Sequence, residues 1–136
     1  YHACDTVVVS AQLESELADL PPEEAQEYLK ELGVKESGLE ALIRSAYEVL
    51  GLRTFFTFND KEVRAWTIHA GDTAVKAAGT IHTDFERGFI KAETVNCEEL
   101  LKQGSVAHAR ETGHYRIEGR DYVVRDGDVL LFKFNV

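Results

Sequence analysis

The chain has 136 residues, enough for one ordinary domain or two very small ones. Hydrophobic residues make up 44% and charged residues 29%, a balance typical of a folded globular protein and not of a disordered one. No apolar run approaches the roughly 18 residues that a transmembrane helix needs. The first 20 residues also lack the basic segment followed by an apolar core that is typical of a signal peptide.

The two cysteines, Cys4 and Cys97, lie far apart and form no CxxC pair. This spacing argues against a disulfide framework or a zinc site, and it favours the reducing cytoplasm as the location. The sequence contains no Met, not even an initiator, which suggests a fragment or a processed chain.

The net charge of −9 is unevenly spread. Residues 1–52 carry a net charge of −8, whereas residues 53–136 carry 13 acidic and 12 basic side chains. The first part should not approach phosphate backbones readily, but the second could do so with one face if its basic residues cluster.

The first third of the chain predicts one strand and then helices. The β-branched run 5–11 is typical of a buried strand, although no partner strand is nearby. Pro21 and Pro22 suit a first helical turn, and Gly33 is placed to end that helix. A capping box at 37–40 begins a second amphipathic helix, which Gly51 ends, so an α-hairpin is expected. Its apolar stripes must pack on each other or on a neighbour.

From Arg53 onward the pattern predicts a mixed sheet wrapped around a helix. Residues 53–59 and 62–69 are expected to form a β-hairpin, and 71–79 a short helix. A strand at 89–95, two short helices ending near Gly104 and Gly113, and three final strands complete an α+β domain of about 80 residues.

No established catalytic motif is present. The sequence contains no phosphate-binding GxxxxGK[ST], no GxGxxG and no HExxH, so neither a catalytic residue nor a metal ligand is assigned. The five histidines are scattered, which favours structural roles. Ser105 and His108 could form a nucleophile and base, but spacing alone is weak evidence.

The stretch 77–93, AAGTIHTDFERGFIKAE, concentrates polar groups between a predicted helix and a strand. A polar connection explains them best, because such side chains often bond free backbone groups. A binding surface is the second interpretation, and catalysis the third. Basic residues also interleave with aromatic residues from Phe89 to the C-terminus, a pattern that can hold RNA on a sheet or simply mark a core face with a solvated outer face.

The segments RAWTIHAGDTAVKAAGTIHTDFERGFIKAETV and GRDYVVRDGDVLLFKFNV closely resemble the C-terminal TGS domain of the Obg-like ATPases, the YchF family of P-loop proteins. This resemblance implies a β-grasp, ubiquitin-like TGS domain at 53–136, preceded by a helical connection at 21–52. Residues 1–20 resemble the end of the family's G domain, with Thr6–Val9 as its last strand. Ser10 and Ala11 match the fifth nucleotide-binding motif. His69, Ala70 and Val75 depart from the family's usual basic pair and Pro.

For the parent protein the resemblance implies ATP or GTP hydrolysis with Mg and association with the ribosome. This chain lacks the phosphate loop, so no cofactor and no enzymatic activity are expected of it alone. A TGS domain that docks on the ribosome or RNA through His82, Asp84, Arg87 and Lys91 is the first hypothesis. The alternative is an intramolecular regulatory domain that packs on its own G domain and uses the same residues as the contact.

Overall fold

The computed structural model describes residues 6–135, and the chain divides after Leu50 into two compact units. The first contains three helices, and the second, Gly51–Val136, contains a sheet with four helices among the described residues. Within this described range, no helix is long and apolar enough to cross a membrane.

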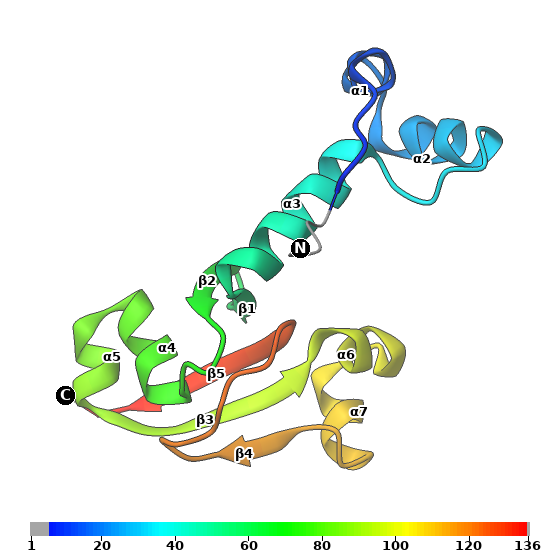
Figure 1. The fold of residues 1–136 in the computed structure, drawn as a ribbon. Helices are drawn as coiled ribbons and strands as arrows, with labels where there is room; N and C mark the ends of the chain where they lie inside the picture. The colour runs from blue at the N-terminus through cyan, green and yellow to red at the C-terminus, as the bar shows by residue number, and fades with distance from the viewer. Residues whose placement is uncertain (1–5, 136) are drawn as a thin grey trace. The chain divides into compact units, whose positions relative to one another are not determined.

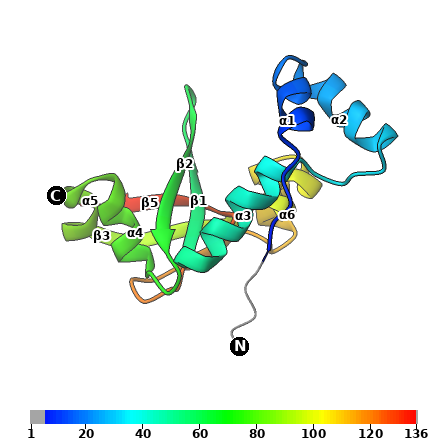
Figure 2. The ribbon, with the colours of Figure 1, turned by 45° about the horizontal axis from the view of Figure 1, so that its top comes forward.

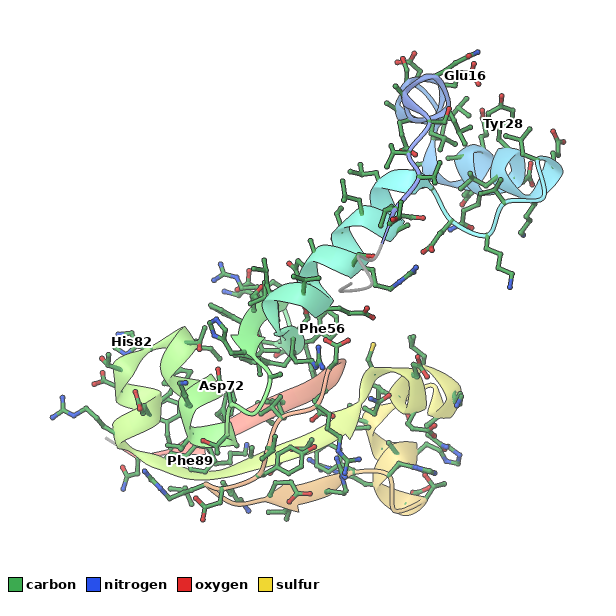
Figure 3. The ribbon with its side chains drawn as sticks, in the orientation of Figure 1. Glu16, Tyr28, Phe56, Asp72, His82 and Phe89 are labelled. Atoms are coloured by element: carbon green, nitrogen blue, oxygen red, sulfur yellow. The ribbon has the colours of Figure 1, made fainter. Side chains whose placement is uncertain are left out.

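In the first unit, helices α1 (Ala11–Ala18) and α2 (Pro22–Glu31) are joined by a polar contact. The Tyr28 hydroxyl donates to Glu16 Oε2 at 2.7 Å, and Figure 3 shows the two side chains between their helices. Pro22 occupies the first turn of α2, and Gly33 has a φ of 70° just beyond its C-cap, as predicted.

Helix α3 (Gly38–Leu50) begins at the predicted capping box. Ser37 Oγ accepts from the Glu40 N–H at 3.1 Å, and Glu40 Oε2 accepts from the Ser37 N–H at 3.0 Å. Glu14 of α1 also accepts from the Gly38 N–H at 2.8 Å. These bonds satisfy three N–H groups at the start of α3 that have no partner within the helix.

The apolar stripe of α3 is present as predicted, but its side chains are exposed. Exposed fractions reach 50% at Ile43 and 65% at Leu50, and no residue of α3 is buried. A helix this amphipathic is stable when its apolar face packs against a neighbour. The apolar side of α3 that residues 6–50 leave exposed, here called the α3 face, consists of Leu39, Leu42, Ile43, Tyr47 and Leu50.

The strand predicted at 5–11 is wrong for the part that the structure describes. Residues 6–10 form no strand, Val8 is 86% exposed, and the sheet includes none of these residues. A β-branched run becomes a buried strand only where neighbouring strands complete its hydrogen bonds. Asp5 and Cys4 lie outside the described residues.

The second unit contains a five-stranded sheet in the order β2-β1-β5-β3-β4. The strands are β1 (Leu52–Phe58), β2 (Val63–His69), β3 (Phe89–Asn96), β4 (Arg116–Glu118) and β5 (Asp128–Phe134). The β1–β2 hairpin is antiparallel, as predicted, and is seen best in Figure 2. The last strand, β5, lies at the centre, parallel to β1 and antiparallel to β3.

Helix α4 (Ala74–Ile81) packs across one face of this sheet (Figure 1). Three alanines of α4, all fully buried, allow it to approach closely. They cover Phe55, Leu130 and Phe132, so the main core lies between α4 and the sheet. Before α4, buried Asp72 accepts from Lys76 Nζ at 2.7 Å and from the His69 N–H at 3.0 Å. Burial alone would raise the pKa of Asp72, but these two bonds bring it below its usual value.

A second, smaller core lies beneath α6 (Cys97–Gln103) and α7 (Val106–Glu111). It contains Val95, Ala109 and Val129. Ser105 is the N-cap of α7, and its Oγ accepts from the His108 backbone N–H at 3.1 Å. This contact explains the spacing of Ser105 and His108 as a helix cap, not as a nucleophile and base.

The final segment differs from the prediction in one respect. Of the three strands expected after Tyr115, the first and third form, but the middle one is reduced to a single bridge between Val123 and Thr73. Tyr122 and Val124 instead hydrogen-bond through their backbones to the start of α4, with the Ala74 N–H donating to the Tyr122 carbonyl at 2.7 Å. Irregular backbone here satisfies its polar groups against the helix instead of a sheet neighbour.

Candidate interaction surface around His82 and Lys91

The stretch singled out in the sequence contains a second helix that was not predicted. Helix α5 (Thr83–Arg87) follows α4 directly, and His82 is both the C-cap of α4 and the N-cap of α5. Figure 3 shows His82 at this junction. Its Nδ1 accepts from the Asp84 backbone N–H at 3.1 Å. With five residues, helix α5 is too short to show a helical pattern of apolar residues, so the sequence alone does not reveal it.

His82 and Asp84 cannot form the cap and an ion pair at the same time. Nδ1 lies 3.5 Å from Asp84 Oδ2, but a nitrogen that accepts the Asp84 N–H carries no proton. The His82 side chain is 60% exposed and that of Asp84 is 40% exposed, so this pair braces the chain turn and also reaches the surface.

Helix α5 is anchored to the sheet by an aromatic contact. Phe85 stacks on Phe134 with ring centroids 4.0 Å apart, and it packs against the main core. Gly79 of α4 allows the carboxyl end of Glu86 to approach, since a Cβ there would lie 2.5 Å from Glu86 Oε2. The inner side of the stretch is thus structural, which agrees with the polar-connection interpretation. Its outer side, with His82, Thr83 and Arg87, remains exposed.

The sheet separates Lys91 from the other three predicted site residues. Ala92 belongs to the core beneath α4, and neighbouring residues of a strand point to opposite faces. Lys91 therefore lies on the face opposite α4, whereas His82, Asp84 and Arg87 belong to α5 and its cap. The four residues do not form one site. The structure brings together only His82 and Asp84.

On its own face, Lys91 lies directly opposite Lys133 in the antiparallel β3–β5 pair. Two like charges at paired positions destabilise a sheet. Glu93, the next residue of β3 on the same face, partly offsets this repulsion. Arg110 Nη2 lies 3.2 Å from Glu93 Oε2, and Tyr115 donates a short hydrogen bond to the same carboxylate. These five residues, here called the lysine face, are Lys91, Glu93, Arg110, Tyr115 and Lys133.

The lysine face holds Glu93 in its charged form. The hydrogen bond from Tyr115, and then Lys133, Arg110 and Lys91, keep the pKa of Glu93 below its usual value despite burial. Burial and the bond to Glu93 raise the pKa of Tyr115. The sequence pattern includes Lys133 among the basic residues that could hold RNA, but it assigns no role to Glu93. The sequence shows that Lys91 and Glu93 are two residues apart and so share a face of the strand. It does not show the strand register that brings Lys133 opposite Lys91.

Glu93→Gln should destabilise the second unit at pH 7 by roughly 1–2 kcal/mol, because a charge-assisted bond is lost. Since the folded pKa of Glu93 is lowered, its contribution is present above the unfolded value and is lost as pH falls through the folded value. The stability difference between wild type and variant should therefore shrink from pH 7 to pH 3. Urea unfolding, followed by the fluorescence of the single Trp, Trp66, measures this difference in the free energy of unfolding at each pH.

The matched control for this measurement is Glu98→Gln. Glu98 is exposed, and its carboxylate has no hydrogen bond or ion pair among residues 6–135. The control should change stability little at either pH. A difference between Glu93→Gln and wild type that is equally large at pH 3 and pH 7 would contradict the role assigned to the charge.

The aromatic residues near the C-terminus do not form a stacking platform for bases. Phe89 and Phe132 are buried in the main core, and Figure 3 shows Phe89 at the start of β3. Phe134 is stacked on Phe85. Tyr115 and Tyr122 have hydroxyls bonded to Glu93 and Asp128. The basic and aromatic pattern in the sequence therefore marks a core face and a charged outer face.

Ser10 and Ala11 lie at the start of α1. Ser10 is its N-cap, and its Oγ accepts from the Leu13 N–H at 3.3 Å. Ala11 is the first residue of the helix and is exposed. The described part of the chain surrounds them with no phosphate loop, so these two residues do not by themselves fit a triphosphate. Nor does it group three or more His, Cys, Asp or Glu residues where a metal could bind.

The strand order β2-β1-β5-β3-β4, with α4 across one face, defines the second unit as an α+β domain of the β-grasp kind. A family model named YchF-GTPase_C, described as a protein of unknown function (DUF933), matches residues 52–135. The chain belongs to this family. The resemblance noted in the sequence is therefore confirmed.

Curated relatives support the same assignment. The chain is 55% identical over 132 residues to the ribosome-binding ATPase YchF of Bacillus subtilis, covering 97% of this chain and 36% of the relative. It is 48% identical over 126 residues to Obg-like ATPase 1 of Caenorhabditis elegans, covering 93% of this chain and 32% of the relative. The chain thus spans about a third of the length of these relatives and corresponds to their C-terminal part.

A solved structure agrees with the fold. The YchF GTPase of Schizosaccharomyces pombe aligns with a TM-score of 0.78 at 37% identity, covering 92% of this chain and 33% of the other. A GTP-binding protein from Pyrococcus horikoshii aligns with a TM-score of 0.52 at 18% identity, which supports the fold alone.

Proposed function

We propose that the β-grasp unit is a docking module through which a larger, cytoplasmic P-loop NTPase binds the ribosome. In this proposal residues 1–20 are the end of a G domain, 21–52 a helical connection and 53–136 the TGS domain. The relatives named ribosome-binding ATPases support the partner. The parent protein would hydrolyse ATP or GTP with Mg, and Ser10 and Ala11 would contribute to the base side of its nucleotide pocket.

The observation that carries this proposal is the Lys91–Lys133 pair on the lysine face. Paired like charges destabilise a sheet, and a bound anionic partner would offset this cost. Lys133 is exposed, and Lys91 is partly exposed, so both can reach a polyanion. Phosphate contacts by lysines release counterions and give binding that weakens as salt rises. Ribosomal RNA supplies such phosphates, and its recognition through Lys91 needs no base stacking.

Arg87 and Lys91 lie on different sides of the sheet, so their charges are reversed in separate variants. Lys91→Glu should weaken ribosome co-sedimentation of the longer parent protein several-fold and reduce its salt dependence by about one phosphate contact. Arg87→Glu, on α5, tests the other side of the sheet. If only Lys91→Glu weakens binding, the lysine face is the docking surface. If only Arg87→Glu does so, the surface lies around His82, Asp84 and Arg87.

Lys61→Glu is the matched control for the reversals. Lys61 lies in the β1–β2 turn of the same unit, is exposed, and undergoes the same change in charge. It should leave co-sedimentation unchanged. Binding that is insensitive to salt and to reversal at both Lys91 and Arg87 would contradict docking through this unit.

Intramolecular regulation is the second candidate, and the α3 face favours it. An apolar helix face that is exposed within this chain suits burial against another part of the parent protein. In that case reversal at Arg87 and Lys91 would change the rate of nucleotide hydrolysis or the stability of the parent, but not its co-sedimentation with ribosomes. The two measurements therefore separate the candidates.

A further inference from the structure

Strand β2 forms one edge of the five-stranded sheet, beside β1 (Figure 2). It pairs with β1 along all of its seven residues, without a shift in register. Val63, Ala65 and Thr67 are exposed on this strand, Val63 at 73%. Within residues 6–135, the outer edge of β2 is therefore open.

The hydrogen bonds of the hairpin show which backbone groups of β2 point away from β1. The Asn59 N–H donates to the Glu62 carbonyl at 3.0 Å, and the Ala70 N–H donates to the Gly51 carbonyl at 2.7 Å. In an antiparallel pair, opposite residues alternate between pairs that exchange hydrogen bonds and pairs that do not. The even-numbered residues of β2 therefore bond to β1, and the odd-numbered residues point their N–H and C=O groups outward.

Three of the four outward residues have free backbone groups. His69 is satisfied locally, because its N–H donates to Asp72 Oδ2 and its carbonyl accepts from the Asp72 N–H, both at 3.0 Å. Val63, Ala65 and Thr67 make no other backbone hydrogen bond within the described residues. Water solvates these groups in a single chain, so their being free selects no partner. The spacing of the three residues and the neighbouring side chains do select one.

The open edge of β2 lacks the features that normally prevent two sheets from pairing edge to edge. Proteins protect an exposed edge with lysines, prolines, bulges or very short strands. The free outward residues of β2 are instead a valine, an alanine and a threonine, and the strand is unbroken. At the opposite edge, β4 has only three residues, and two of them, Arg116 and Glu118, are charged. Of the two edges, β2 is thus the one suited to accept another strand.

The free residues are spaced symmetrically about Ala65. An antiparallel pair of two β2 strands centred on Ala65 places Ala65 opposite Ala65 and, on either side of it, Val63 opposite Thr67. This arrangement uses all the free backbone groups of both strands. It uses none of the groups of His69 that Asp72 already occupies.

The side chains of β2 favour the same register. Arg64 of one copy lies opposite Trp66 of the other, so no like charges are directly paired. Arg64 already lies over its own Trp66, 5.7 Å from the ring centroid, and it pairs with Glu62 at 3.3 Å. A pair centred one residue earlier would set Arg64 against Arg64. A pair centred one residue later would need the backbone of His69, which Asp72 occupies.

From this self-complementary edge we infer that β2 pairs with β2 of a second copy of this chain and joins the two sheets edge to edge. The contact involves few residues per copy, so it buries less than the roughly 1,200 Å² at which stable complexes begin. We therefore expect a weak dimer with a dissociation constant of about 0.1–1 mM. The interface is separate from the lysine face, on β3 and β5, and does not depend on the proposed docking.

NMR of the ¹⁵N-labelled 136-residue chain between about 0.05 and 2 mM tests this inference. The amide signals of Val63, Ala65 and Thr67 should shift with concentration, and sedimentation equilibrium should show a dimer. The same three amides should exchange with deuterium about two- to fourfold more slowly at the highest concentration, because pairing protects them. The amides of Arg64 and Trp66, which already bond to β1, should change less.

Charge variants at Ala65 test the register. Ala65→Lys should weaken association several-fold, because it sets two like charges directly opposite each other, and Ala65→Glu should do the same. An equimolar mixture of the two variants should associate at least as tightly as wild type, since opposite charges then face each other. Ala65 is exposed, so both variants should fold, which Trp66 fluorescence checks.

Ile117→Lys is the matched control, because it adds the same charge at an exposed position of the other edge strand, β4. It should leave association unchanged. Three results would overturn the inference. They are shifts and exchange rates at residues 63–67 that do not depend on concentration, a loss of association in Ile117→Lys as large as in Ala65→Lys, and a mixture of the two Ala65 variants that associates no more tightly than either alone.

Discussion

Phe55→Ala should destabilise the β-grasp unit by about 3–5 kcal/mol, the usual cost of removing a buried phenyl ring from a core. Phe55 is 0% exposed and lies on β1, between β2 and β5. Its ring meets Phe132 edge to face, with centroids 6.0 Å apart. The variant therefore loses transfer free energy, an aromatic contact and packing at the centre of the sheet.

Phe58→Ala is the matched control because it changes the same residue type on the same strand. Phe58 is 37% exposed and lies three positions further along β1. Its removal should cost about 1 kcal/mol or less. Urea unfolding followed by Trp66 fluorescence distinguishes the two, since Trp66 packs against the main core and its Nε1–H donates to Thr57 at 2.9 Å. Equal losses in the two variants would contradict the core described here.

Gly88→Ala is the second large effect expected, about 1–3 kcal/mol or more, from overcrowding. A Cβ at Gly88 would lie 2.1 Å from the Asn135 carbonyl oxygen and 2.7 Å from its carbonyl carbon. Both are backbone atoms. The Asn135 N–H donates to the Gly88 carbonyl at 2.8 Å, so the end of β5 cannot move away without losing this bond. The ordinary φ of −93° means that the cost arises from crowding and not from backbone strain.

Gly119→Ala separates crowding from the general effect of replacing glycine. Nothing lies within 4 Å of a Cβ at Gly119. The control should therefore be neutral or slightly stabilising, because alanine restricts the unfolded chain. Thermal unfolding monitored by Trp66 fluorescence compares the two, with roughly 4–8 °C expected for each kcal/mol in a domain of this size. A Gly88→Ala variant as stable as wild type would show that β5 does not end against Gly88.

The sequence predicts most of the β-grasp unit because most of its helices, strands and turns are indicated by short stretches of sequence. The hairpin, the helix after Asp72 and the glycines at 104 and 113 all follow from short-range pattern. Helix α5 was missed because its start depends on a histidine cap, a residue type that rarely signals a helix. The strand expected at 5–11 was wrong because a β-branched run favours extended backbone, but the sequence does not show whether a partner strand is present to pair with it.

The candidate site was predictable in composition but not in arrangement. His82, Asp84, Arg87 and Lys91 are close in sequence, and yet the sheet places Lys91 on the other face. Lys133, which pairs with Lys91, comes from β5. Arg110 and Tyr115, which bind the neighbouring Glu93, come from α7 and from the position just before β4. Such groupings depend on strand register, which no single stretch of sequence contains.

The central position of β5 has a consequence for how the protein is made. The Thr54 N–H donates to the Asp126 carboxylate at 2.8 Å, across 72 positions of sequence, at the point where β1 and β5 meet. At 5–20 residues per second, a ribosome needs roughly 4–14 s to synthesise that interval. During this time β1 and β3 have no strand between them, and the edge of β1 that pairs with β5 has no partner strand. The nascent unit therefore depends on rapid arrival of its last strand, or on a chaperone, to avoid aggregation.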